Sequence, residues 1–81
     1  MSQPELNDLQ QSLNSAEPTT PEQAEAVEEL KGHVEKSMTD PAHHNTLRER
    51  LQERIVLFED GHPQLAAAME SAINTLSLGG I

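Results

Sequence analysis

Apolar side chains recur every three or four residues along four stretches of the chain, and strict alternation of apolar and polar residues is absent. This spacing places the apolar side chains on one face of an α-helix rather than of a β-strand. It predicts an all-α protein of about four helices, roughly at residues 3–15, 21–38, 42–59 and 63–77. The apolar positions are, in chain order, Leu6, Leu9, Leu13; Ala24, Val27, Leu30, Val34, Met38; Leu47, Leu51, Ile55, Phe58; Leu65, Met69, Ile73, Leu76.

Prolines mark the expected helix starts, because the amide that proline lacks has no helical partner in the first turn. They are Pro4, Pro21, Pro41 and Pro63. Thr20 and Gln23 have the spacing of a capping box, in which each side chain bonds the other residue's backbone amide. The Asp40 carboxylate can cap the third helix, and the proline after it disfavours helical geometry at Asp40. We therefore predict a break between the second and third helices.

Glycines suggest where helices end. Gly61 follows the third predicted helix, at a natural position for a left-handed cap. Gly79 and Gly80 follow the fourth helix and are expected to terminate it. Gly32 falls inside the second helix, where it is either a tolerated defect or a point at which another helix approaches closely.

The third and fourth helices are expected to form an antiparallel hairpin, because only about three residues join them. Bulky residues, including Val56 and Leu57, lie on the first of the two helices. Small residues lie on the second: Ala66, Ala67, Ala68 and Ala72. Large side chains interdigitate well with small ones across a helix pair, which makes this hairpin the best-specified unit of the chain.

With 81 residues, the chain is expected to form a single domain over 1–81: a mobile short helix and turn at 1–20, and a helical bundle at 21–81. It has no Cys, Trp or Tyr, and Phe58 is its one aromatic residue. A core of this size stabilises a fold by only about 3–5 kcal/mol, and disulfides are excluded. We therefore expect the bundle to be completed by a second copy of the chain, as a homodimer.

The formal net charge is -9, with 14 acidic and 5 basic residues. Such a charge opposes binding to nucleic acid, and no apolar run approaches the roughly 20 residues that cross a bilayer. The first 30 residues contain seven acidic residues and no Lys or Arg. This acidic N-terminal part of the chain either keeps the protein soluble or binds a larger basic partner, such as a component of transcription or translation. The lack of cysteine fits a cytoplasmic location.

No nucleophile, base and orienting group fall into a recognisable catalytic pattern, so we expect no enzyme and no cofactor. Asp40, His43 and His44 are weak candidates for metal ligands. Adjacent histidines on a helix point about 100° apart and do not readily share one ion. The leading interpretation is a non-enzymatic protein–protein interaction or structural module, with an acidic regulator and a weak metal-binding protein as the alternatives.

The C-terminal third carries a series of short motifs: Phe58-Glu59, His62-Pro63, Leu65-Ala66, an amphipathic helix through Ile73 and Leu76, and Gly80-Ile81. In these motifs the chain resembles a family of small bacterial proteins known as domain of unknown function 4404. The resemblance implies a helical fold and leaves the function open, since the family carries no established activity. It also marks His62, whose ring would bond a helix end or whose apolar edge would close the hairpin. The core and interaction signature is Phe58, His62, Pro63, Leu65, Ile73, Leu76 and Ile81.

Overall fold

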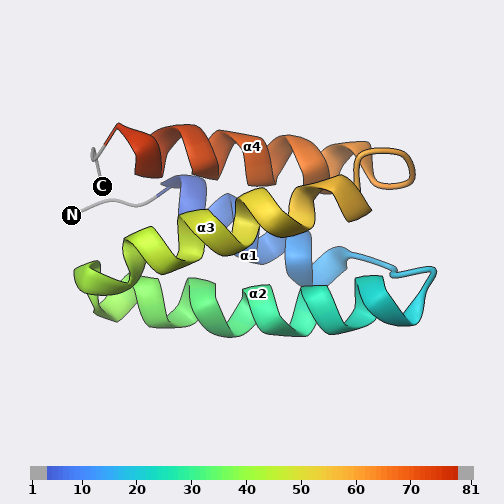
Figure 1. The fold of residues 1–81 in the computed structure, drawn as a ribbon, viewed down its shortest axis with the longest axis horizontal. Coiled ribbons are helices and arrows are strands. Elements are labelled where there is room, and N and C mark those ends of the chain that lie inside the picture. Colours follow the sequence, from blue (N-terminus) through green and yellow to red (C-terminus); the bar gives the residue numbers. More distant parts are fainter. Residues whose placement is uncertain (1–3, 79–81) are drawn as a thin grey trace.

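The computed structural model describes residues 4–78, which form an antiparallel four-helix bundle (Figure 1). Its α-helices are α1 (Pro4–Ser15), α2 (Pro21–Thr39), α3 (His44–Arg54) and α4 (Pro63–Ser77). Two 3₁₀ helices, η1 (Pro41–His43) and η2 (Ile55–Leu57), flank α3. Residues 4–78 contain no strand, so the predicted all-α class is confirmed.

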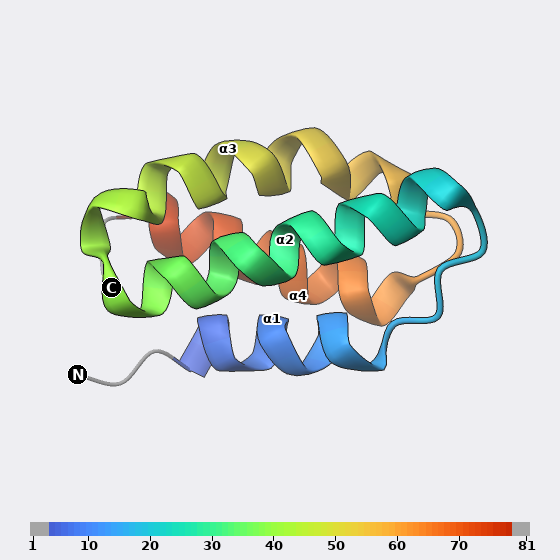
Figure 2. The same ribbon diagram turned by 90° about the horizontal axis from the view of Figure 1, so that it is seen from below.

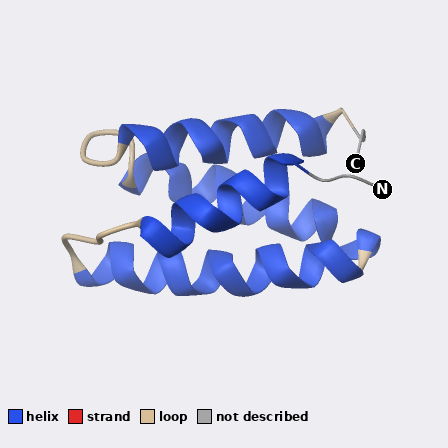
Figure 3. Cartoon of the chain, turned by 180° about the vertical axis from the view of Figure 1, so that it is seen from behind, coloured by secondary structure: helices blue, strands red, loops and turns tan. Residues whose placement is uncertain are grey.

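Each helix runs antiparallel to the one before it, and short loops join them at the two ends of the bundle (Figures 1 and 3). Around the bundle, α1 contacts α2 and α4, and α3 contacts the same two helices. Figure 2 shows α1 and α3 on opposite sides of α2. The predicted hairpin of the third and fourth helices is therefore confirmed, and α1 belongs to the same bundle. Within residues 4–78, no helix is both long and apolar enough to cross a membrane.

The core draws on all four helices and on Phe58, whose side chain is fully buried. Its buried apolar members are Leu6, Leu9, Leu13, Ala26, Val27, Leu30, Val34, Leu47, Leu51, Phe58, Leu65, Met69, Ala72 and Leu76. Among the described residues, Val56 and Leu78 are the large hydrophobic side chains left exposed. One copy of the chain thus buries an apolar core to which all four helices contribute. The homodimer itself stays a prediction.

The buried face of α2 begins with a polar residue. Ala24, expected on this face, is exposed, while Gln23 and Ala26 are buried. Gln23 lies four residues before Val27, so both side chains point into the bundle.

Two caps set the ends of α2. The Thr20 hydroxyl accepts a hydrogen bond of 3.1 Å from the Gln23 amide, as the capping box predicts. The returning bond differs, because the Gln23 side chain accepts from the backbone amide of Thr19 rather than from that of Thr20. At the other end Asp40 is extended, with φ of -135°, and its carboxylate accepts from the Ala42 amide at 3.1 Å. The predicted break before the third helix is confirmed.

Neither internal glycine plays the specialised role considered for it. A Cβ at Gly32 or Gly61 would meet no atom within 4 Å, so no helix approaches Gly32 closely. Gly61 is not in the left-handed conformation, and the expected left-handed cap is wrong. The turn is instead closed by a 2.9 Å hydrogen bond from the His62 amide to the Phe58 carbonyl. Gly79, Gly80 and Ile81 lie outside the described residues.

Replacing Gly32 by alanine is expected to raise the free energy of unfolding by about 0.5–1 kcal/mol, because alanine favours the helix and fits the open space. Urea unfolding followed by circular dichroism measures the change. Ala24→Gly, at an exposed position of the same helix, is the reverse control and should lower stability by a similar amount. A Gly32→Ala variant no more stable than the wild type would show that the glycine has another role.

Candidate functional site

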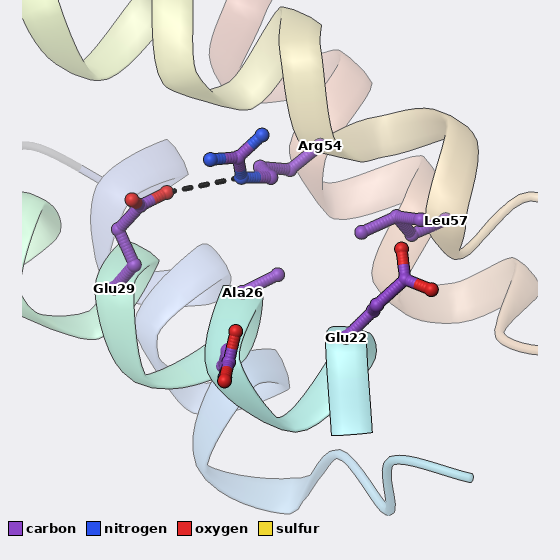
Figure 4. A pocket seen from close by; sticks show the side chains of 6 residues that line it. Glu22, Ala26, Glu29, Arg54 and Leu57 are labelled. Carbon is purple, nitrogen blue, oxygen red and sulfur yellow. Dashed lines mark hydrogen bonds and ion pairs between the residues drawn. The ribbon is translucent and has the colours of Figure 1, made fainter. Parts of the chain in front are cut away.

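An acidic groove lies between α2 and the segment formed by the end of α3 and η2 (Figure 4). Its volume is about 250 Å³, and it is lined by Glu22, Glu25, Ala26, Glu29, Arg54 and Leu57. We refer to these six residues as the acidic groove. Figure 4 shows Ala26 between Glu22 and Glu29, with Arg54 and Leu57 facing them across the groove.

Helical spacing explains why three carboxylates line one groove. Glu22, Glu25 and Glu29 are three and four residues apart, so α2 presents them on one side. Ala26 lies within this set and is only 3% exposed, which gives the groove an apolar floor. Leu57 is partly buried and adds apolar surface from η2.

One cation enters the groove from α3. The Arg54 Nε donates to a Glu29 carboxylate oxygen at 3.1 Å, and both side chains are 35% exposed. Such a pair, partly open to water, contributes up to about 1 kcal/mol. Among residues 4–78 the other ion pairs join Glu28 to Lys31 and Arg50 to Glu53. The carboxylates of Glu22 and Glu25 therefore have no ion pair within the described part of the chain.

A polar network centred on Gln23 lies where α2 begins, η2 ends and α4 begins. The side-chain Nε2 of Gln23 donates to the Leu57 carbonyl at 2.8 Å. Its side-chain oxygen accepts from the Thr19 amide at 2.8 Å and from the Thr19 hydroxyl at 3.0 Å. The His62 Nε2 approaches the same oxygen at 3.2 Å and acts as the donor. The side chain of Gln23 thus joins the first turn of α2 to η2 and to the loop residues that precede α2 and α4.

The ring of His62 has a second contact, with Phe58. The two ring centroids are 5.8 Å apart and the planes are inclined at 71°, an edge-to-face arrangement. His62 precedes α4 but makes no side-chain cap hydrogen bond there. The ring thus donates to a side chain in the first turn of α2 and packs against Phe58, while the roles expected for it at a helix end and in closing the hairpin stay predictions.

A pair of histidines lies farther along α2. The His33 Nδ1 and the His43 Nε2 are 2.7 Å apart, and the two rings are stacked at 4.9 Å with an interplanar angle of 17°. Asp40 and Pro41 turn the chain back after α2, which brings η1 over the last turns of that helix. We refer to His33 and His43 as the histidine pair.

The residues expected as weak metal ligands do not converge. The Asp40 carboxylate bonds the Ala42 amide, and the His44 Nε2 donates to the Ser37 carbonyl at 3.0 Å. His43 faces His33 instead. Residues 4–78 contain no group of three or more potential ligands around a common point. The structure therefore does not bring Asp40, His43 and His44 together as a site.

The pKa of His33 lies below the ordinary imidazole value of 6.5. Burial is the largest cause, because it disfavours the charged ring, and the neighbouring His43 is the next. Arg50 and Lys36 lower the pKa further, while Glu29, one turn earlier on α2, opposes them. At neutral pH a neutral His33 can share a hydrogen bond with His43.

A comparison with family models gives one match, to the domain of unknown function DUF4404, over residues 3–81. The chain belongs to the DUF4404 family. No curated protein and no solved structure matches it.

Three of the DUF4404 motifs considered above, Phe58-Glu59, His62-Pro63 and Leu65-Ala66, lie at the turn between η2 and α4. Phe58 and Leu65 are buried, and His62 between them is half-buried. Pro63 is the exposed first residue of α4. Further along α4, Leu76 is buried and Ile73 is partly buried, while Ile81 lies outside the described residues.

Two features of this DUF4404 chain were missed from its sequence. The Gln23 network had a readable signal, since Gln23 occupies an apolar position of the α2 pattern, and a polar side chain there needs a buried partner. The histidine pair had none, because ten residues and a chain reversal separate its members.

Gln23→Leu is expected to lower the free energy of unfolding by about 1–3 kcal/mol, because it leaves the Leu57 carbonyl and the Thr19 amide without their partner. Thermal and urea unfolding measure the loss. Gln52→Leu, at an exposed position of α3, makes the same chemical change and should alter stability by no more than about 0.5 kcal/mol. Equal effects of the two substitutions would contradict a structural role for the network.

Acidification is expected to destabilise the fold through His33. Its pKa lies below 6.5 in the folded chain, so the unfolded chain binds more protons as the pH falls. The stability contributed by neutral His33 is therefore present above pH 6.5 and is lost as the pH falls through the folded-state pKa. Urea unfolding between pH 7.5 and 4.5, in metal-free buffer, should show a shallower pH dependence in His33→Gln than in the wild type. Identical profiles would contradict this assignment.

Proposed function

We propose that this DUF4404 chain is a non-enzymatic protein–protein interaction module whose acidic groove binds a basic segment of a partner protein. The observation that carries the proposal is the arrangement of the groove: Glu22, Glu25 and Glu29 surround an apolar surface formed by Ala26 and Leu57.

Lysine and arginine side chains match both parts of this surface. Their aliphatic stems cover apolar area while the charged ends reach carboxylates at its edge. Glu22 and Glu25 have no ion pair among the described residues, so a partner's cations would meet them without breaking an existing contact. Arg54 already shows this mode of contact from within the chain.

The size of the groove favours side chains over an enclosed small molecule. Its volume of about 250 Å³ is below the roughly 300–1,000 Å³ of typical small-molecule sites. An amphipathic basic helix supplies both the cations and the apolar residues that such a surface requires.

A basic partner fits the charge of this surface better than a second copy of the chain does. Each copy carries a formal net charge of -9, and association of two like-charged surfaces is opposed by their repulsion. Of the functions considered from the sequence, the groove therefore best supports an acidic regulator that binds a basic partner protein. The homodimer would need a different surface.

Binding is tested with a synthetic amphipathic helical peptide that carries Lys and Leu at helical spacing and one Trp. The chain has no Trp or Tyr, so the peptide's Trp fluorescence reports binding directly. The triple variant Glu22→Gln, Glu25→Gln, Glu29→Gln should bind about tenfold more weakly, since each exposed charge contact contributes about 0.2–1 kcal/mol. Binding to the wild type should also weaken as salt is raised.

The matched control is Glu59→Gln, Asp60→Asn, Glu70→Gln, which removes three exposed carboxylates outside the groove. It should retain the affinity of the wild type within about threefold, a change of no more than about 0.7 kcal/mol. Equal loss in the two triple variants would show attraction to net charge alone and would overturn the proposal, as would absence of binding to the wild type.

A further inference from the structure

The histidine pair has the geometry of a metal chelate, with a proton in place of the ion. A hydrogen bond between two neutral imidazoles places one proton between a donor nitrogen and an acceptor nitrogen. In the pair, these atoms are the His33 Nδ1 and the His43 Nε2, at 2.7 Å. A change of tautomer in the donor ring, which moves this proton to its other nitrogen, leaves two ring lone pairs at one location with both rings still neutral, as a divalent ion that binds imidazole requires.

The distance between the nitrogens selects among ions. Metal–imidazole bonds of about 2.0–2.1 Å place two nitrogens about 3.3 Å apart at a tetrahedral angle and about 2.9 Å apart at a right angle. The 2.7 Å is the length of a hydrogen bond, and from it the nitrogens need to separate less to reach the right-angle value than the tetrahedral one. The right angle belongs to neighbouring ligands in square-planar copper(II) and nickel(II). Copper(II) also has the highest affinity of the first-row divalent ions for nitrogen ligands.

The movement required is small. The stacked rings, inclined at 17°, must turn so that both lone pairs point at one ion. Rotation of an imidazole about its second side-chain torsion has broad preferences, so this turn needs no change of backbone. The nitrogens separate by only a few tenths of an ångström, and both rings are half-buried rather than enclosed.

The charges around the pair restrict the ion further. Glu29 attracts a cation, whereas Lys36 and Arg50 repel it, because these groups act on the His33 ring in the same sense. A hard cation that binds mainly by charge gains little in such surroundings. An ion with strong affinity for imidazole nitrogen is needed, and water would complete its coordination.

We propose that His33 and His43 form a two-imidazole site for copper(II), with water in the remaining positions. The site differs from the Asp40, His43 and His44 set considered from the sequence, since it shares only His43 with that set. Neither of its two ligands lines the acidic groove, so its failure would leave the proposed function intact.

The test adds one equivalent of copper(II) to the purified full chain. Electron paramagnetic resonance should show two nitrogen ligands, and thermal unfolding followed by circular dichroism should shift upward by a few degrees, about the size expected for saturating binding to the folded state alone. His33→Gln and His43→Gln should each weaken copper binding about tenfold or more, since each removes one of two ligands.

His44→Gln is the matched control, because it also leaves three histidines and lies next to His43. It should bind copper as the wild type does. Each variant's metal-free unfolding transition and helical signal establish that it is folded, and glutamine retains hydrogen-bonding groups at each position. Copper binding retained by both His33→Gln and His43→Gln, a signal with fewer than two nitrogens, or equal loss in His44→Gln would overturn the proposal.

Discussion

The bundle depends on the burial of one apolar face from each of four helices in a common core. A helix of 11–19 residues is marginal by itself in water, so each helix here is stabilised chiefly by its packing partners. The chain meets this constraint with aliphatic side chains and one aromatic, Phe58, all within a single copy. When the apolar face of α2 packs into the core, the orientation of its polar residues is fixed as well. The carboxylates of α2 that line the groove then lie beside the end of α3.

Polar contacts give this core a definite register. Aliphatic packing alone tolerates small rotations and shifts between helices, because hydrophobic contact has little directional preference. The hydrogen bonds of Gln23 do have direction, and they join α2 to the Leu57 carbonyl and to His62. Rotation of α2 by one residue would break them and leave buried polar groups unpaired. A glutamine at a core position is thus better explained as a determinant of alignment than as a defect.

Local chemistry was readable from the sequence, and contacts between distant segments were not. The four helices, the break at Asp40 and the hairpin follow from periodicity, proline and a short linker, which act over a few residues. The Gly61 prediction was wrong because the turn is closed by the His62 amide rather than by a left-handed residue. From the sequence, the acidic groove could be anticipated only as an excess of acidic residues, because Arg54 and Leu57 come from another part of the chain.

Glu29 acts on both the acidic groove and the histidine pair, since it lines the groove and lies one helical turn before His33. Its carboxylate holds Arg54 at 3.1 Å, and its charge raises the pKa of His33 against the effect of burial. A basic segment in the groove and a cation at the histidine pair would therefore share the attraction of one carboxylate. Binding of a basic segment would therefore weaken binding of the cation, and thermodynamic linkage requires the cation to weaken binding of the segment by the same factor. Glu29 is 35% exposed, and charge contacts open to water contribute little, so that coupling is small.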